Sequence, residues 1–266
     1  MMKEAGYFLD ETRALADEVT RSCNDFAAPT LFKGWTIDNI LRHLHFWNGA
    51  ALTSLEDEER FQALLAEAFP AIAQQGMRTF EDTRLAELSG PPLLEAWLAG
   101  AEELSSAFHN ADPDARLPWA GPPMSARASI SARLMETWAH GQAIYDLAGE
   151  ARVDTDRIYP IAELGVRTFG WTYKTRGEPK PETKPFVVLT APSGERWTFN
   201  EEREDERIEG PATAFCQVVT QTRNIADVPL DVRGEVATDW MAKAQCFAGP
   251  PEAPPAPGTR RMQGRH

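Results

Sequence analysis

Apolar residues recur every three or four positions over most of the first 150 residues, with polar residues between them. This spacing is typical of amphipathic helices and predicts five of them, at about residues 6–24, 36–54, 57–75, 91–109 and 125–148. Proline and glycine lie between these segments and end them. Long helices with short links favour a bundle, in which facing helices bring side chains together in the interior.

The pattern changes after Gly149. One more helix is predicted at residues 154–173, followed by a polar, proline-rich linker at 175–184. Strand-like segments then follow at residues 185–190 and 195–199. A Pro-Ser-Gly turn separates these two segments, so they predict a β-hairpin.

The remainder of the chain mixes both patterns. The charged run at residues 201–209 is typical of a solvated turn or edge, residues 210–221 and 236–247 favour helices, and residues 230–233 favour a strand. A mixture of short strands and helices in one segment predicts a small α+β domain.

The expected fold class is therefore α+β, with a helix bundle at residues 1–150 and an α+β domain at residues 155–249. The last segment, residues 250–266, has five prolines and few large apolar residues. Such a segment buries too little apolar surface to offset the entropy of ordering, so we expect a disordered tail.

Composition narrows the classes of function. The chain has 266 residues, of which 42% are hydrophobic and 25% charged, which is ordinary for a globular protein. Its net charge of −13 disfavours binding to nucleic acid, because a phosphate backbone attracts a basic face. The same charge disfavours adsorption to an anionic membrane. A small-molecule substrate is the expected partner.

The cysteines and the N-terminus suggest a compartment. Cys23, Cys216 and Cys246 are odd in number, widely spaced and form no C-x-x-C motif, which fits a reducing environment. Each is most simply a small buried apolar residue. The first residues lack the apolar core of a signal peptide, and no apolar run reaches the ~20 residues that span a bilayer. We expect a cytoplasmic protein.

Three residues carry the candidate chemistry. Glu136 and His140 are four residues apart in a predicted helix, so they lie on the same face and can hold one object together. His43 lies on the apolar face of the helix at residues 36–54, whereas His45 points roughly 200° away from it at ~100° per residue. The ordinary alternatives are a solvated acid–base pair and a buried histidine bonded to a backbone carbonyl.

Two imidazoles and one carboxylate form the ligand set that zinc favours in catalytic sites, where a fourth position stays open. We therefore predict that His43, Glu136 and His140 bind one divalent ion, with Zn²⁺ the first choice. Other catalytic signatures are missing from the sequence, including the G-x-S-x-G elbow, the phosphate-binding loop and H-E-x-x-H.

Two short motifs resemble a known signature. They are Gly34-Trp35-Thr36 followed by His43-Leu44, and Glu136-x-Trp138-x-His140-Gly141. Together they resemble the metal-binding signature of the mycothiol-dependent maleylpyruvate isomerase family, whose members have a DinB-like four-helix bundle. The resemblance implies that these two histidines and the glutamate hold a divalent ion, usually zinc. It also implies a low-molecular-weight thiol as cosubstrate.

The second half resembles the sterol-carrier-like C-terminal domain of that family. The likeness rests on Ile208-Glu209-Gly210-Pro211-Ala212, Gln221-Thr222-Arg223 and Leu230-Asp231-Val232-Arg233-Gly234. A motif like Ala248-Gly249-Pro250-Pro251 is similar to the end of an uncharacterised metal-binding subgroup. In the isomerase a C-terminal arginine contributes to catalysis, and the resemblance points to Arg223 for that role. Many relatives have an Asp where this chain has Ala143, which removes a hydrogen bond that orients a metal ligand.

Three functions follow as hypotheses. The first is a metal-dependent, thiol-dependent isomerase or S-transferase, in which a metal-bound thiolate adds to a small organic substrate and Arg223 anchors a substrate carboxylate. The second is a hydrolase or cyclase that uses metal-bound water. The third is a non-enzymatic carrier of a small ligand or lipid. Bundles of this kind often pair through helix faces, so a homodimer is also expected.

Overall fold

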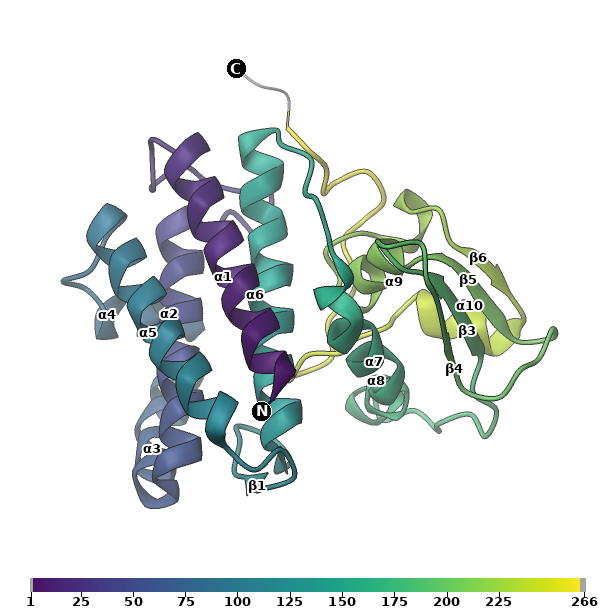
Figure 1. Cartoon of the computed structure of the whole chain (residues 1–266), viewed down its shortest axis with the longest axis horizontal. Coiled ribbons are helices and arrows are strands. Elements are labelled where there is room, and N and C mark those ends of the chain that lie inside the picture. The colour runs from purple at the N-terminus through teal and green to yellow at the C-terminus, as the bar shows by residue number, and fades with distance from the viewer. Residues whose placement is uncertain (1, 264–266) are drawn as a thin grey trace. The chain divides into compact units, whose positions relative to one another are not determined.

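The computed structural model describes residues 2–263, and the chain divides between Gly149 and Glu150 into two compact units (Figure 1). The described elements of the first unit are helices apart from one ribbon of two short strands, and the second unit combines helices with a four-stranded sheet. The predicted α+β fold is confirmed.

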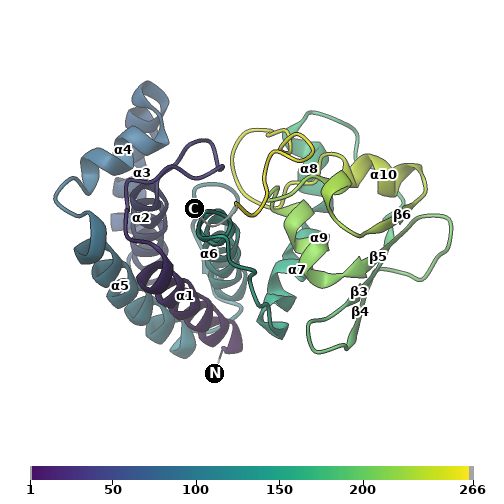
Figure 2. The same cartoon turned by 90° about the horizontal axis from the view of Figure 1, so that it is seen from above.

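Four long helices of the first unit form a bundle, in which α1 and α2 each pack against both α5 and α6. Figures 1 and 2 both show these helices side by side. Two further helices, α3 and α4, lie against α2. The bounds of the helices are Lys3–Ser22 (α1), Ile37–Glu56 (α2), Glu58–Gln75 (α3), Met77–Arg84 (α4), Gly90–Asn110 (α5) and Ala126–Ala148 (α6).

Local chemistry explains where the two site-bearing helices begin and end. The Thr36 hydroxyl accepts from the Asn39 backbone N–H and the Asn39 side chain accepts from the Thr36 N–H, which is a capping box at the start of α2. Ser125 accepts from the Ala128 N–H and starts α6. Gly149 ends α6 with a φ of 68°, which costs glycine no steric strain.

The core of the bundle is a cluster of aliphatic and aromatic side chains from α1, α2, α5 and α6. Leu15, Ile40, Leu44, Trp97 and Ile144 in this cluster are completely buried. Burying each such side chain contributes roughly 1.5–3 kcal/mol, which offsets the cost of placing polar groups in the same interior.

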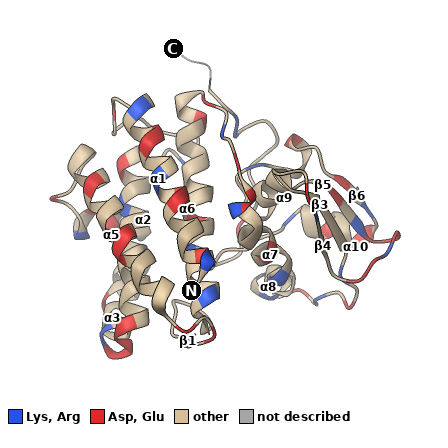
Figure 3. Ribbon diagram, in the orientation of Figure 1, with Lys and Arg blue, Asp and Glu red and all other residues tan. Residues whose placement is uncertain are grey.

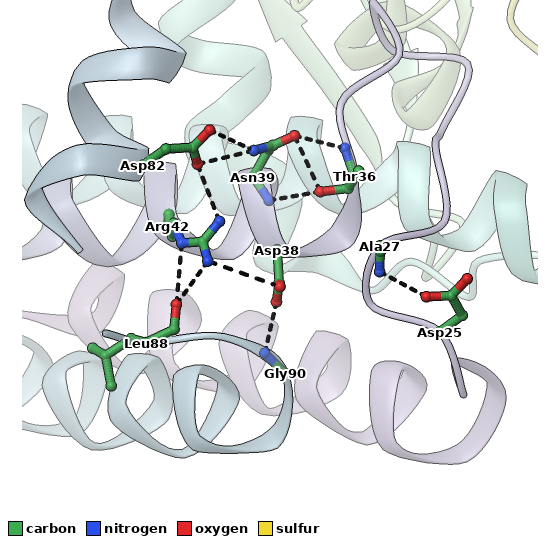
Figure 4. Close-up of polar contacts among 9 residues, drawn as sticks. All are labelled: Asp25, Ala27, Thr36, Asp38, Asn39, Arg42, Asp82, Leu88 and Gly90. Atoms are coloured by element: carbon green, nitrogen blue, oxygen red, sulfur yellow. Dashed lines mark hydrogen bonds and ion pairs between the residues drawn. The ribbon is translucent and has the colours of Figure 1, made fainter. Parts of the chain in front are cut away.

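Helix α4 was not expected from the sequence, because it has only eight residues and most of them are polar. A polar clamp holds it against α2 (Figure 4). In this clamp Asp82 accepts from the Asn39 amide and from the Arg42 guanidinium, and Arg42 also donates to the Leu88 carbonyl. Asp38 accepts from the Gly90 N–H, so the start of α5 is tied to the same turn of α2.

A short ribbon leads into α6. Its strands are β1, Arg116–Leu117, and β2, Met124–Ser125, and they pair antiparallel. The loop between them carries Trp119, whose ring stacks on Phe61 of α3 and meets Trp47 of α2 edge-on. The loop is therefore held against the bundle by aromatic packing.

The second unit is built on one mixed sheet with the strand order β4-β3-β5-β6. Strands β3 and β5 are parallel, whereas β4 and β6 pair antiparallel with them. Helix α9 packs on β3 and β5, and α7 packs on α9. The elements are η1 (Asp156–Ile158), α7 (Tyr159–Arg167), α8 (Phe169–Thr175), β3 (Phe186–Thr190), β4 (Arg196–Phe199), β5 (Arg207–Pro211), α9 (Ala212–Val219), η2 (Ile225–Asp227), β6 (Asp231–Arg233) and α10 (Glu235–Met241).

The predicted hairpin is confirmed as β3 and β4, but three other expectations for this unit need correction. The charged run at residues 201–209 is not only a turn, since β5 begins at Arg207 and lies inside the sheet. Arg207 pairs with Glu204 and Glu209, so the charges of the strand neutralise one another. The helix expected at residues 154–173 is interrupted at Thr168, and the one expected at 236–247 ends at Met241.

Residues 250–263 have no helix or strand, yet hydrogen bonds tie part of this segment to the second unit. The Glu252 carbonyl accepts from Arg176 and Gln221, and the Pro255 carbonyl accepts from Asn224. The disordered tail expected at residues 250–266 stays a prediction, and residues 264–266 lie outside the described part of the chain.

Among the described residues, no helix has both the length and the apolarity needed to cross a bilayer. Acidic and basic residues are scattered over the elements of both units in the view of Figure 3.

Candidate metal centre

His43, Glu136 and His140 come together in the first unit. One ligand atom from each of the three lies within 4.8 Å of the other two. The Glu136 Oε2 atom is 3.2 Å from His140 Nε2 and 3.7 Å from His43 Nε2. The geometry thus brings two imidazole nitrogens and a carboxylate oxygen around one point, although 93 residues separate His43 from Glu136 in the sequence.

The helices explain this convergence. Glu136 and His140 are one turn apart on α6, and α6 packs against α2, which carries His43. His43 is buried, and the side chains of Glu136 and His140 keep 17% and 13% of their surface exposed. The three groups are therefore largely shielded by the bundle, and each keeps a small exposed fraction.

Glu81 completes the centre behind His43, and the sequence did not point to it. This carboxylate of α4 is 1% exposed, and its Oε1 lies 2.8 Å from His43 Nδ1 and accepts from the Trp47 indole N–H at 2.8 Å. With Nδ1 held by Glu81, His43 presents Nε2 toward Glu136. A carboxylate that orients a ligating histidine in this way is common in metal sites.

An aromatic turn covers the two histidines. Trp35 stacks on the His140 ring at 5.6 Å and meets His43 edge-on at 5.4 Å, while Phe32 meets His140 edge-on at 5.0 Å. The turn is closed by hydrogen bonds from the Thr30 N–H and hydroxyl to the Trp35 carbonyl. It thereby fixes the orientation of both imidazoles without using their ring nitrogens.

The charges of the centre shift its pKa values in opposite directions. Burial by itself would lower the pKa of His43, but the charge of Glu81 and hydrogen bonds to Glu136 and Glu81 raise it to about 9. Burial lowers the pKa of His140 despite its bond to Glu136. Burial would raise the pKa of Glu136, but the two histidines and Arg133 hold it well below its usual range.

Arg133 is a fifth buried ionisable group, beside the three candidate ligands and Glu81. It lies one turn before Glu136 on α6 and is 5% exposed. Its Nη2 is 3.9 Å from Glu136 Oε1, and its guanidinium lies over the Trp119 ring at 5.3 Å. Burial lowers the pKa of Arg133, which the charge of Glu136 partly opposes.

Arg223, the other residue suggested by the resemblance, belongs to the second unit. It lies between α9 and η2, and its Nη1 donates to the Thr222 carbonyl at 2.9 Å. Its catalytic role stays a prediction. Ala143 is buried in the bundle core and has no polar atom in its side chain to orient a ligand.

None of the three cysteines belongs to the centre, and two of them are poor nucleophiles. Burial and the charge of Glu18 raise the pKa of Cys23 to about 11. Burial also raises the pKa of Cys216, well above its ordinary value. Cys246 is buried in the second unit.

Comparison with protein families identifies the first unit. The model described as the mycothiol maleylpyruvate isomerase N-terminal domain matches residues 8–145, a range that includes His43, Glu136 and His140. Two uncharacterised proteins of Mycobacterium tuberculosis, from the CDC 1551 / Oshkosh and H37Rv strains, are each 36% identical to this chain over 256 residues. The match covers 94% of this chain and 98% of each relative.

Solved structures show a similar fold. The crystal structure of the mycothiol-dependent maleylpyruvate isomerase matches with a TM-score of 0.52 and 17% identity, over 81% of this chain and 87% of that one. A histidine-to-alanine mutant of the same enzyme matches with a TM-score of 0.51 and 18% identity over the same shares of the two chains. At this level of identity the likeness concerns the fold.

Proposed function

The chain belongs to the mycothiol maleylpyruvate isomerase family. We propose that it is a metal-dependent enzyme that acts on a small organic substrate with the help of a low-molecular-weight thiol, either as an isomerase or as an S-transferase. The observation that carries the proposal is the convergence of His43, Glu136 and His140 on one point in the bundle. Zn²⁺ is the proposed ion.

The three side chains offer the types of ligand atom that such an ion binds. Two neutral imidazoles and one carboxylate are the ligand set of catalytic zinc sites with an open position. His43 Nδ1 is already engaged by Glu81, so Nε2 remains for the ion. When bound, a divalent ion would supply Lewis-acid chemistry and lower the pKa of a thiol or water.

The protein's own groups would prepare the site for this chemistry. Glu81 and Trp35 fix the orientation of the imidazoles, so that little reorganisation is needed on binding. His43 must release a proton before its Nε2 can bind an ion, since the site raises its pKa to about 9. The bundle around the centre limits the access of water to it.

The reacting thiol is proposed to come from outside the protein. Because the pKa of Cys23 is raised to about 11 and that of Cys216 is raised well above its ordinary value, neither forms appreciable thiolate at neutral pH. Arg223 is proposed to anchor a substrate carboxylate, as the family resemblance implies.

Metal analysis of the purified protein tests the proposal first. We expect about one equivalent of zinc per chain, and a loss of at least tenfold in zinc affinity for His140→Ala, because one of three ligands is removed. His109→Ala, at the end of α5, is the matched control and should keep its zinc. A parent protein that stays free of metal after incubation with excess zinc would refute the proposal.

An activity assay then separates the two kinds of metal chemistry. The zinc-loaded protein is incubated with unsaturated carbonyl acids, with and without mycothiol. We expect turnover only in the presence of the thiol. Turnover that persists without any thiol would instead select a hydrolase or cyclase that activates water.

A further inference from the structure

We propose that Arg133 binds a carboxylate group of the small molecule that occupies the metal centre. The inference rests on the proposed function and adds to it a carboxylate-binding residue inside the bundle. It differs from the role suggested for Arg223, which belongs to the other unit.

The hydrogen-bonding state of Arg133 is the first observation. The residue is 5% exposed, and within the described part of the chain neither its Nε nor its Nη1 has a hydrogen-bond partner. The remaining nitrogen, Nη2, is 3.9 Å from Glu136 Oε1, which is too long for a hydrogen bond. A buried guanidinium with its donors unmet is costly unless a ligand completes it.

The position of Arg133 is the second observation. Glu136 has one oxygen, Oε2, beside the two histidines, and its other oxygen, Oε1, toward Arg133. The guanidinium therefore lies next to the metal ligands and can reach a group attached to a molecule bound there. Trp119, which is itself packed on Phe61, lies against the guanidinium at 5.3 Å and holds it in place.

The balance of charge is the third observation. With its histidines neutral, the centre has two carboxylates, Glu81 and Glu136, and one guanidinium, Arg133. A bound dication would leave one positive charge in excess in a buried site. An anionic ligand would neutralise that excess, and a carboxylate matches the planar donors of arginine.

A purely structural role explains these observations less well. As a counter-charge to Glu136, Arg133 would be expected at hydrogen-bond distance, whereas the two groups are 3.9 Å apart. As packing for Trp119, an uncharged Met or Leu would fill the space without the cost of burying a charge.

Binding of propionate, a carboxylate with no other reactive group, tests the inference. Calorimetric titration of the zinc-loaded protein should give a dissociation constant at least tenfold higher for Arg133→Met than for the parent, with zinc content retained. Arg133→Lys should be intermediate, because it keeps the charge but not the planar donors. Arg127→Met is the control, because Arg127 lies on the first turn of α6 and pairs with Glu4 of α1. This variant should bind propionate as tightly as the parent does.

Equal affinity for propionate in the parent and in zinc-loaded Arg133→Met would overturn the inference. So would a loss of affinity confined to Arg223→Met. If Arg133→Met does not fold, the Nε–H resonance of Arg133 in ¹H–¹⁵N spectra of the parent decides, assigned by its absence from Arg133→Lys. Propionate should shift this resonance, and an unchanged resonance at saturation would overturn the inference.

The same titration distinguishes this inference from the proposed function. If the parent binds no zinc, the proposed function fails, and propionate is titrated into the metal-free protein. Propionate binding that depends on Arg133 would then still support an anion site. If propionate does not bind either, both the proposed function and the inference on Arg133 are overturned.

Discussion

Glu81 shows how one buried side chain determines the state of another. It accepts from the Trp47 indole, contacts His43 Nδ1, and is the largest of the influences that raise the pKa of His43. Its second oxygen, Oε2, has no partner within the described residues. The histidine on α2 is therefore oriented and charged by a carboxylate on α4.

We expect Glu81→Gln to weaken zinc binding by roughly 10- to 100-fold, the range typical when a group that orients a metal ligand is changed. The amide keeps the shape of the side chain but removes the charge that favours the required tautomer of His43. Competition with a chelating dye measures the affinity. Glu67→Gln, on the exposed face of α3, should leave it unchanged.

A matching affinity in Glu81→Gln and the parent would show that the orientation of His43 comes from Trp35 and the helix alone. The double variant with Trp35→Ala would then be the next measurement.

The stability of the metal-free protein should depend on pH in a defined direction. His43 has a pKa of about 9 in the folded chain against an ordinary 6.5. Protonated His43 therefore adds on the order of a few kcal/mol to the free energy of unfolding. This contribution is complete below pH 6.5 and is lost as pH rises from 6.5 through 9. The pKa of His140 is lowered, so its contribution is present above pH 6.5 and lost as pH falls.

Denaturant unfolding in the presence of a chelator, repeated from pH 5 to 10, should give maximum stability near pH 6.5. His43→Gln should flatten the loss on the alkaline side and also reduce the loss on the acidic side, because the charge of His43 contributes to the lowered pKa of His140. A parent that is as stable at pH 9 as at pH 6.5 would contradict the assigned charge of His43.

At the scale of elements, the polar clamp on α2 positions α4 and with it Glu81. Asp82 follows Glu81 directly in the sequence. It accepts hydrogen bonds from Asn39 and Arg42, which lie in the first two turns of α2 (Figure 4). Because α4 has only eight residues, it is too short to be stable as an isolated helix. Its place next to the proposed metal centre therefore depends on these bonds.

We expect Asp82→Ala to lower the free energy of local unfolding of α4 by roughly 1–2 kcal/mol, since two partners lose a hydrogen bond each. Faster amide exchange at residues 77–84, with the rest of the bundle unchanged, would report this loss. Zinc affinity should fall by less than it does in Glu81→Gln. Thr83→Ala, which removes an exposed bond within α4, is the control and should have little effect.

At the scale of the whole molecule, the described chain consists of two compact units, and the three residues of the proposed metal centre all belong to the first one. An ion that binds the folded state stabilises the unit that holds it. The sheet of the second unit has its own core, in which Val187, Leu189, Ile208 and Phe215 are fully buried.

Zinc should therefore protect the two units to different extents. When the concentration of free zinc is one hundred times its dissociation constant, zinc should raise the unfolding free energy of the first unit by about 2.7 kcal/mol. Amide exchange should slow in α2 and α6 and stay the same in β3 and β5. His140→Ala should abolish the difference, and an equal gain in both units would show that they unfold together.

The sequence by itself determined the main elements and the candidate ligands. Helical spacing predicted the long helices, and the spacing of Glu136 and His140 placed them on one face because an α-helix repeats every 3.6 residues. The periodicity of α2 also separated His43 from His45. These inferences succeed because they depend on local geometry, which is the same wherever the helix is packed.

Only the tertiary structure decided which distant groups meet. Glu81 lies in a segment for which no helix was expected, and Arg133 lies in the same helix as Glu136 and His140. Nothing local distinguishes either residue from the other charged residues. Their roles arise because α4 is clamped to α2 and because the loop with Trp119 folds against the bundle. Burial and electrostatic coupling depend on neighbours brought together by packing, and helical periodicity does not record which neighbours those are.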